Sequence, residues 1–488
     1  MKKISLFLAA LLLFLGSCQD FLDQDLRSEQ NYDNYFQSEN DLISFANGMF
    51  GGLITWTWTG GGLFFNNFWV LQDLASDNCY EAGPSIDMLD LSQFTFDINN
   101  STLYYIWTGC YEVINSANVL LEESENILKY SKPEVKDHLQ GEAYFLRGML
   151  YFELVRLFGD VPLQLFSTKS VSESKIPRTP SSQVYESVIA DLKKAEQLLA
   201  VNPFPNRVQG MPTSLTASSL LAKVCLTRGA LTNNVNDFTE AVGHLEKVIG
   251  KYTLEPEFED IFKISNANTG EIIWAVNFSG TLGEGWTTNQ FIVRLMPTTV
   301  SDKGVRNGQG WERPTEHLYN SFHNTDKRKT VTFITGFEEE IFDGPYIKKY
   351  WDQEAEGGRQ NGESDADFIY IRYADVLLMY AEVLNEINNG PTTDAYTAIN
   401  DVRNRAGLDD LPEGMDYQTF KNAVLQERQW EFVMEGHRWY DLTRMGKLME
   451  RVSLVKPTAN IQPYHILFPI PQKERYLNPE LGQNEGYQ

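Results

Sequence analysis

Residues 427–447 read ERQWEFVMEGHRWYDLTRMGK, and this stretch carries the strongest structural signal in the chain. Glu427, Glu431 and Glu435 are spaced four apart, which would place them on one face of a helix. Several arginines follow closely, interleaved with aromatic residues. Charges that balance locally among apolar residues predict a buried ion network that fixes helix packing. The alternative is a catalytic or metal site built on a glutamate pair and His437.

Helical periodicity extends outward from this stretch over much of the chain. Apolar residues recur at a spacing of three and four, which predicts helices over 104–128, 133–158, 181–200, 216–231, 237–250, 368–388, 392–406 and 417–448. Paired helices of this length, with small residues where they cross, are typical of tetratricopeptide-like hairpins. An unclassified helical bundle would bury the same faces. We therefore expect a mainly α fold with such hairpins as its scaffold.

Two segments differ in composition from the helical parts, at about 51–102 and 265–366. They are rich in glycine and tryptophan, and they carry strand-like runs at 272–276 and 330–334. We expect loop-rich, partly β insertions in a single domain that covers residues 18–488. Loops held by a rigid scaffold are where binding sites usually lie.

The composition narrows the class of ligand. The chain has 488 residues with a net charge of −25, from 41 basic and 66 acidic side chains. This charge disfavours nucleic acid, because phosphate binding needs clustered lysine and arginine, and it disfavours adsorption to anionic lipid. Aromatic residues make up 13% of the chain. The acidic net charge and the high aromatic content both favour a neutral ligand that stacks on aromatic rings.

The amino terminus predicts a lipoprotein signal peptide over residues 1–17. Lys2 and Lys3 precede an apolar run at 4–15, which is too short to span a membrane as a helix. Small residues lead into Cys18, the predicted site of lipid attachment; each buried acyl methylene contributes about 0.8 kcal/mol. The alternative is an ordinary signal peptide with a chance cysteine nearby.

No motif in the sequence indicates a cofactor, a metal or a catalytic residue. Cys79, Cys110 and Cys225 lack the paired spacing of a zinc site and allow at most one disulfide. Cys110 and Cys225 stand among apolar residues at helical spacing and are expected to be buried thiols. The chain also contains no nucleophile elbow, P-loop or His-Glu-x-x-His motif.

The candidate ligand-binding residues lie in the two insertions. Trp286 and Trp311 are flanked by glycines in polar loops, so neither has much local core to pack into. Tyr80 follows Asn78 closely, and Asn289 follows Trp286. A flat ring binds the C–H-rich face of a sugar, and amide groups can satisfy its hydroxyls. An ordinary packing role for these residues is the alternative.

The chain resembles the SusD/RagB family at several separate places. Residues 427–446 match the family signature E-R-x-x-E-[LF]-x-x-E-G-x-R-[WF]-x-D-L-x-R-x-G, and 466–487 resemble the usual chain end, with Glu485 where the family has proline. Further matching segments are 18–23, 142–162 and 371–382.

The resemblance implies a lipoprotein on the surface of a Bacteroidetes-type cell, anchored in the outer membrane. It implies binding of a nutrient, most often an oligosaccharide, and delivery to a SusC-like TonB-dependent transporter without catalysis. Four tetratricopeptide-like repeats would pack on that transporter. A glycoside hydrolase on a helical scaffold, a protein-docking scaffold without a small ligand, and a binder of peptides or glycoproteins remain as alternatives.

Overall fold

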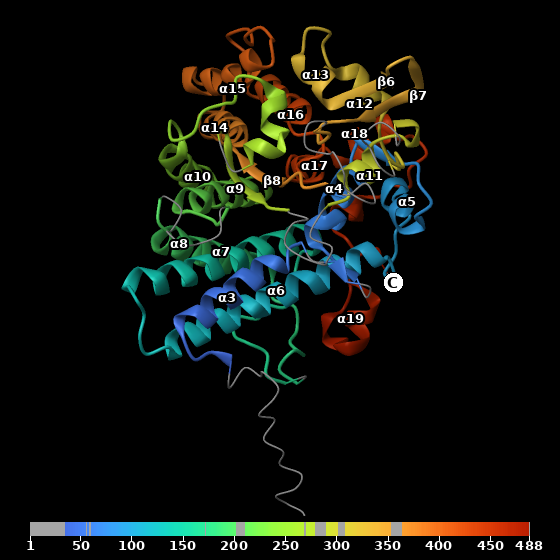
Figure 1. The fold of residues 1–488 in the computed structure, drawn as a ribbon. Helices are drawn as coiled ribbons and strands as arrows, with labels where there is room; N and C mark the ends of the chain where they lie inside the picture. The colour runs from blue at the N-terminus through green and yellow to red at the C-terminus, as the bar shows by residue number, and fades with distance from the viewer. Residues whose placement is uncertain are drawn as a thin grey trace, which may run out of the picture.

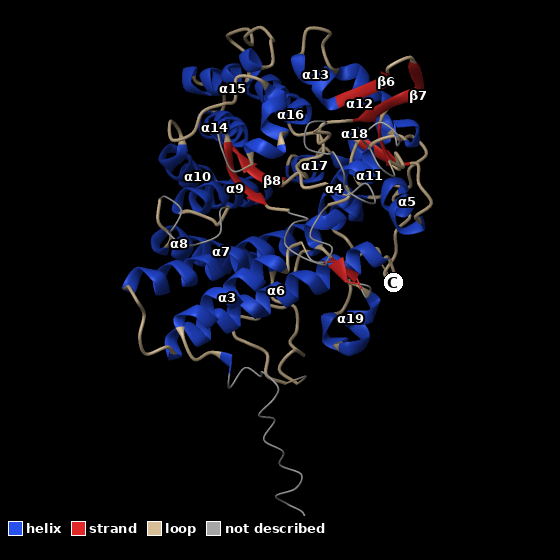
Figure 2. Cartoon of the chain, viewed as in Figure 1, coloured by secondary structure: helices blue, strands red, loops and turns tan. Residues whose placement is uncertain are grey.

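The computed structural model describes residues 35–54, 56–57, 60–170, 172–201, 210–267, 270–278, 289–300, 308–352 and 364–487. The predicted signal peptide, Cys18 and Trp286 lie outside these residues. Helices dominate the described part of the chain, and strands are few and short (Figure 1, Figure 2).

Nine helices of 13 residues or more form the scaffold. They are α3 (Glu39–Gly51), α6 (Ser101–Asn126), α7 (Pro133–Phe158), α8 (Ser181–Leu198), α9 (Ser214–Thr232), α10 (Val235–Val248), α14 (Tyr373–Asn388), α15 (Thr393–Arg405) and α16 (Tyr417–Glu431), counted within the described ranges. Helices that follow one another in the chain pack side by side, as α7 does with α8, α9 with α10, and α14 with α15. The predicted mainly α fold with tetratricopeptide-like hairpins is confirmed.

Helix α7 shows how the sequence sets these hairpins. Pro133 begins the helix, where a missing N–H leaves no bond unmade, and Gly159 ends it with a φ of 71°. Its side chains are buried almost all round. A Cβ added at Gly148 would lie 3.0 Å from Leu192 Cγ of α8. The glycine therefore allows the close approach of the two helices that small residues at crossings predicted.

Two of the predicted helices are wrong at one end. Residues 368–372 form strand β8 (Phe368–Arg372), which pairs antiparallel with β4 (Ile272–Val276), and α14 begins only after it. The helix predicted at 417–448 is divided into α16, α17 (Arg438–Arg444) and the start of α18 (Leu448–Val455). The break contains Met434 with φ 61° and Gly436 with φ 71°, backbone conformations that no α-helix accommodates.

Shorter elements fill the insertions and the carboxyl end. They are β1 (Trp56–Thr57), β2 (Gly60–Gly61), the π-helix η1 (Leu63–Asn67), α4 (Phe68–Leu74), β3 (Cys79–Glu81), α5 (Ile86–Gln93), η2 (Phe258–Phe262), η3 (Ile264–Asn266), α11 (Phe291–Leu295), η4 (Thr298–Val300), β5 (Glu312–Pro314), α12 (Glu316–Ser321), α13 (Lys327–Thr332), β6 (Phe333–Phe337), β7 (Glu340–Ile347), η6 (Pro463–Ile466), α19 (Gln472–Leu477) and η7 (Pro479–Leu481). The strands form antiparallel pairs β1–β2, β3–β5, β4–β8 and β6–β7.

The insertions therefore contain more helix than expected. The strand-like run at 272–276 is confirmed as β4, whereas the run at 330–334 is mostly wrong, since α13 extends to Thr332 and β6 begins at Phe333. Cys79, Cys110 and Cys225 are free and buried, which confirms the prediction for Cys110 and Cys225. Among the helices described, none is both long and apolar enough to cross a bilayer.

Candidate functional site

The signature stretch 427–447 forms a buried ion network. Arg372 of β8 is its centre: the guanidinium donates to Glu271 at 2.6 Å, to Glu431 at 2.5 Å and to Glu435 at 2.7 Å. All four side chains are 1% exposed or less. Glu435 lies beyond the end of α16, so the expected shared helical face is wrong for it. The network agrees with the predicted packing role, because every carboxylate in it has an arginine partner.

His437 is buried beside an arginine and an aromatic ring. Arg428 lies 3.4 Å from His437 Nδ1, and burial holds the pKa of His437 well below its usual value. The ring packs against Phe432, tilted by 32° and with 4.6 Å between the ring centroids. Across the described ranges, no group of three or more histidine, cysteine, aspartate or glutamate side chains could hold a metal ion.

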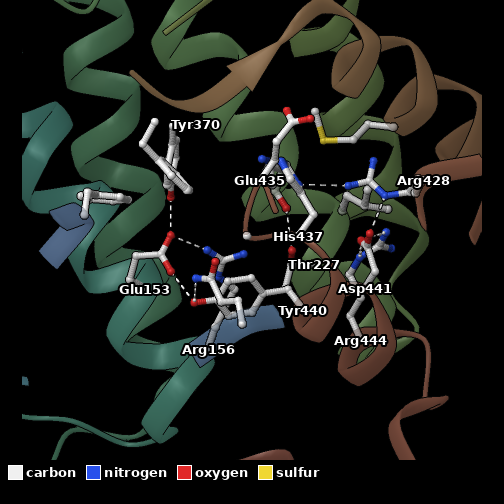
Figure 3. A pocket seen from close by; sticks show the side chains of 17 residues that line it. Glu153, Arg156, Thr227, Tyr370, Arg428, Glu435, His437, Tyr440, Asp441 and Arg444 are labelled. Atoms are coloured by element: carbon white, nitrogen blue, oxygen red, sulfur yellow. Dashed lines mark hydrogen bonds and ion pairs between the residues drawn. The ribbon is translucent and has the colours of Figure 1, made fainter. Parts of the chain in front are cut away.

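A small polar cavity of about 30 Å³ lies beside this network (Figure 3). Glu153 of α7 accepts hydrogen bonds from the hydroxyls of Tyr370 and Tyr440 and pairs with Arg156. Arg156 also stacks over the Tyr440 ring, with Cζ 3.5 Å from the centroid. The cavity has room for one or two water molecules and none for a sugar. The contacts of Glu153 and Arg156 join α7 to β8 and to α17.

Two predicted ligand-binding residues meet at the surface on the β3–β5 pair. Tyr80 of β3 lies opposite Arg313 of β5, and Ala82 N donates to Trp311 O at 2.6 Å. Side chains alternate along a strand, so Tyr80 and Arg313 point outward while their neighbours in β3 and β5 are buried. Trp311 lies just before β5, and Arg294 Cζ is 5.7 Å from the centroid of its ring. Tyr80 is 38% exposed and Trp311 is half-buried. We call Tyr80, Trp311, Arg313 and Tyr346 the aromatic face.

Tyr346 of β7 completes the aromatic face. Arg313 Cζ lies 4.1 Å from the Tyr346 ring centroid, and Arg313 pairs with Asp343 at 3.0 Å. Asp343 also accepts the Tyr346 hydroxyl at 3.0 Å. The face thus offers three aromatic rings, one guanidinium and one exposed carboxylate, which are the groups that stack on sugar rings and bond to hydroxyls.

The inward side of the same strand pair carries Glu81 and Glu312, which lie directly opposite each other. Arg294 of α11 donates to Glu81 at 2.5 Å and lies 3.6 Å from Glu312. Neither carboxylate oxygen of Glu312 has a hydrogen-bond partner in the described part of the chain. Burial therefore raises the pKa of Glu312 well above its usual value. Glu81 also accepts the N–H of Gly83, so it fixes the turn beneath Trp311.

Asn78 and Asn289 are fully buried, unlike the aromatic residues. The Asn78 amide donates to Asp73 at 3.0 Å and accepts from Gln429 at 3.0 Å. The Asn289 amide donates to Ala366 O and accepts from Phe291 N at 3.0 Å. Their burial argues against direct ligand contact, because the polar atoms are already bonded inside the protein. Neither amide belongs to the aromatic face.

Arg313 and Tyr346 are residues of the aromatic face that sequence reasoning missed. The alternation Trp311-Glu312-Arg313-Pro314 could have indicated Arg313, since it lies two positions after Trp311 on an extended segment. Tyr346 had no local signal, because it reaches the face through the packing of the β6–β7 hairpin against β5.

Comparisons with known proteins give consistent matches. Residues 338–487 match the model of the SusD family, and residues 20–226 match a family described as starch-binding associating with outer membrane. The chain is 29% identical to SusD-like protein P2 from Formosa agariphila over 100% of both chains. It is 21% identical to the starch-binding protein SusD from Bacteroides thetaiotaomicron, over 87% of this chain and 86% of that protein.

A solved structure agrees with these sequence matches. The crystal structure of a SusD superfamily protein from Parabacteroides distasonis has a TM-score of 0.80 and 25% identity, covering 94% of this chain and 100% of that chain. Family matches at both ends of the chain, a relative aligned over its whole length and a shared fold together show that the protein belongs to the SusD/RagB family.

Proposed function

We propose that this protein is a cell-surface glycan-binding lipoprotein that captures an oligosaccharide on the aromatic face and delivers it to a SusC-type TonB-dependent transporter. The observation that carries the proposal is the outward position of Tyr80 and Arg313 on the β3–β5 pair, with the half-buried Trp311 just before β5. Two similarities support the proposal: one to the starch-binding protein SusD, and one to the family described as starch-binding.

Sugar chemistry fits the geometry of the aromatic face. A pyranose ring places its axial C–H groups against an indole or phenol ring, and its hydroxyls then need donors and acceptors at the edge. Arg313 supplies donors and Asp343 supplies an exposed acceptor, with 71% of the Asp343 side chain accessible. Trp286 lies outside the described residues and stays a predicted ligand-binding residue from the sequence alone.

The first experiment measures binding to a panel of polysaccharides by calorimetry and affinity electrophoresis. Trp311→Ala and Tyr80→Ala are each expected to weaken binding roughly 10-fold, about 1.4 kcal/mol. Tyr476→Ala is the matched control, because Tyr476 is 76% exposed on α19. Unchanged affinity in both site variants, with wild-type melting curves, would show that the ligand binds elsewhere.

Binding without chemistry is the expected mechanism. A glycosidase needs two carboxylates flanking the bound sugar, whereas Glu81 and Glu312 lie on the inward side at 6% and 0% exposure. Asp343 is the acid on the aromatic face, and it is bound by Arg313 and Tyr346. Release of reducing ends by the purified protein would favour the hydrolase. Binding of glycoprotein but of no free glycan would favour the peptide or glycoprotein alternative.

The anchor and the transporter partner need their own tests. Labelled fatty acid is expected to attach to the wild-type protein and not to Cys18→Ala, and surface proteolysis of intact cells should reach only the anchored form. The tetratricopeptide-like helices are the expected contact with the transporter. Copurification of a SusC-like barrel with the wild-type protein supports delivery, and its absence under mild detergent counts against it.

A further inference from the structure

A second cavity, separate from the aromatic face, lies at the other end of the molecule. It has a volume of about 270 Å³ and lies between α6, residues 162–168 and 174–176, and the α19–η7 segment. Figure 1 places α19 at the lower end and the β6–β7 hairpin, which carries Tyr346, at the upper end. The walls are mostly apolar and are made by Trp107, Tyr111, Ile114, Ile176, Leu477 and Leu481.

The cavity is held open by bonds that do not involve a ligand. Asn118 of α6 donates to Gln164 O at 3.1 Å and to Phe166 O at 3.0 Å. Asn115 accepts Thr168 N at 2.8 Å, and Asn478 donates to Ile176 O at 2.8 Å. Residues 164–168 are therefore tied to α6, and Ile176 is tied to the carboxyl end. A pocket that exists before binding loses little conformational entropy when it is filled.

Two acceptors at this cavity lack a donor. Gln164 is 6% exposed, and its Oε1 atom has no hydrogen-bond partner in the part of the chain that the structure describes. Glu474 of α19 is half-buried, and none of the described residues donates to its carboxylate or forms an ion pair with it. A buried acceptor without a donor is costly, so a ligand with N–H or O–H groups would be stabilised here.

Aromatic rings form the wall beside these acceptors. The Tyr111 hydroxyl donates to Pro162 O at 2.8 Å, and the Trp107 ring packs against Phe158 with 5.1 Å between centroids. Both rings are thus fixed in place. Aromatic faces attract cations, and the attraction is larger where water is excluded. A carboxylate, an amide oxygen and two fixed rings around an apolar space favour an apolar body with a cationic head.

We propose that this cavity binds a small organic cation, an aromatic or aliphatic body that carries an amine or guanidine group. The head would take the place beside Glu474 and Gln164, and the body would fill the space between Trp107 and Leu477. Two lysines lie nearby. Lys175 is exposed at the rim of the cavity, and Lys473 Nζ lies 4.5 Å from the centroid of the Tyr104 ring. The net charge of −25 adds a general attraction for cations.

The test compares three fragments of one size: phenethylamine, 2-phenylethanol and phenylacetate. Binding is measured by saturation-transfer NMR and calorimetry on the purified protein. Phenethylamine is expected to bind with a Kd of about 1 mM, typical of a fragment, roughly 10-fold tighter than the alcohol and tighter still than the acid. Equal binding of all three fragments, or binding of none, overturns the proposal.

Two variants locate the binding. Glu474→Gln keeps the side-chain shape and should abolish the preference for the amine, while Glu480→Gln, an exposed neighbour, should keep it. Leu477→Trp should fill the mouth of the cavity and remove binding. Leu454→Trp is its control, since Leu454 is 63% exposed and Leu477 is 64% exposed. Amine binding that survives both cavity variants overturns the proposal, and melting curves confirm that each variant is folded.

A last pair of probes distinguishes the two sources of such a cation. Agmatine represents a free guanidine, and an acetylated Gly-Arg-Gly amide represents an arginine side chain in a polypeptide. Tighter binding of agmatine supports a small ligand. Tighter binding of the peptide overturns that assignment in favour of a protein partner.

Discussion

Asp77 and Arg438 form a bidentate ion pair that joins two segments 361 residues apart in the chain. Arg438 Nε lies 2.6 Å from Asp77 Oδ1, and Arg438 Nη2 lies 2.7 Å from Asp77 Oδ2. Asp77 comes two residues before β3, and Arg438 begins α17 in the signature stretch. The stretch that predicted the fold therefore also holds the strand that carries Tyr80.

Breaking this pair should destabilise the whole protein. Arg438→Met leaves the Asp77 carboxylate buried at 0% exposure without its main partner, and removal of one member of a buried pair costs about 3–5 kcal/mol. We expect that loss in the free energy of unfolding, measured by urea denaturation. Lys447→Met breaks the exposed pair with Glu450 and should cost under about 1 kcal/mol. A similar small loss for Arg438→Met would mean that the pair has no structural role.

Gly83 sets the position of Trp311. A Cβ added at Gly83 would lie 2.5 Å from Trp311 Cγ and 2.4 Å from Glu81 Oε1. Gly83→Ala should therefore displace the indole ring and weaken glycan binding roughly 5- to 10-fold, about 1–1.4 kcal/mol, as measured by calorimetry.

The control for Gly83→Ala is Gly243→Ala on α10, where no atom lies within 4 Å of the added Cβ. That change should stabilise the protein by about 0.5–1 kcal/mol and leave affinity unchanged. Wild-type affinity in Gly83→Ala would argue against Trp311 as a ligand-binding residue.

Asp73 makes stability depend on pH. Burial raises its pKa from 3.8 to about 7, although Asn78 donates to it. Between these two values the unfolded chain releases the proton and the folded protein keeps it, so the free energy of unfolding falls as the pH rises. Asp73→Asn removes this contribution. Relative to the wild type, the free energy of unfolding of Asp73→Asn should rise by roughly 1.4 kcal/mol per pH unit between these two pKa values.

Urea denaturation at pH 4.5, 6 and 7.5 measures this difference. The two proteins should be closest in stability at the lowest pH, because the carboxyl is then neutral in more of both states. A constant difference across the three pH values would show that Asp73 does not titrate in this window.

The scaffold could be predicted from sequence because helical periodicity is local. The predicted boundaries of two helices were wrong, because tertiary contacts decide where those helices begin or end. Phe368–Arg372 is buried at every position, so it shows no alternation and cannot be told from a buried helix by pattern. The helix predicted to 448 breaks where a Cβ on Gly436 would lie 2.0 Å from Gln72 Oε1, a contact between segments far apart in the chain.

The site was partly predictable for the same physical reason. Trp311 and Tyr80 stood out as aromatic residues in polar loops, a local feature. Asn78 lies in the same polar stretch of sequence, yet it is buried just before β3 and its amide bonds to Asp73 and Gln429. Arg313 and Tyr346 join the face only through strand pairing and hairpin packing, which local sequence does not encode.

Tyr346 is expected to act through its ring and not through its hydroxyl. The ring lies under the Arg313 guanidinium at 4.1 Å and against Gly310, where an added Cβ would be 2.4 Å from Tyr346 Cε1. Tyr346→Ala removes the support of both Arg313 and the turn that leads to Trp311. An exposed cation–π contact contributes about 0.5–1 kcal/mol, so glycan affinity should fall roughly 2- to 5-fold in calorimetry.

Tyr346→Phe keeps the ring and loses only the hydrogen bond to Asp343, whose side chain is 71% exposed. A hydrogen bond open to water contributes little, because water replaces it. The phenylalanine variant should therefore bind glycan within a factor of two of the wild type. Equal losses in Tyr346→Phe and Tyr346→Ala would assign the effect to the hydroxyl, and would identify Asp343 and the Tyr346 hydroxyl as the polar contacts of the bound sugar.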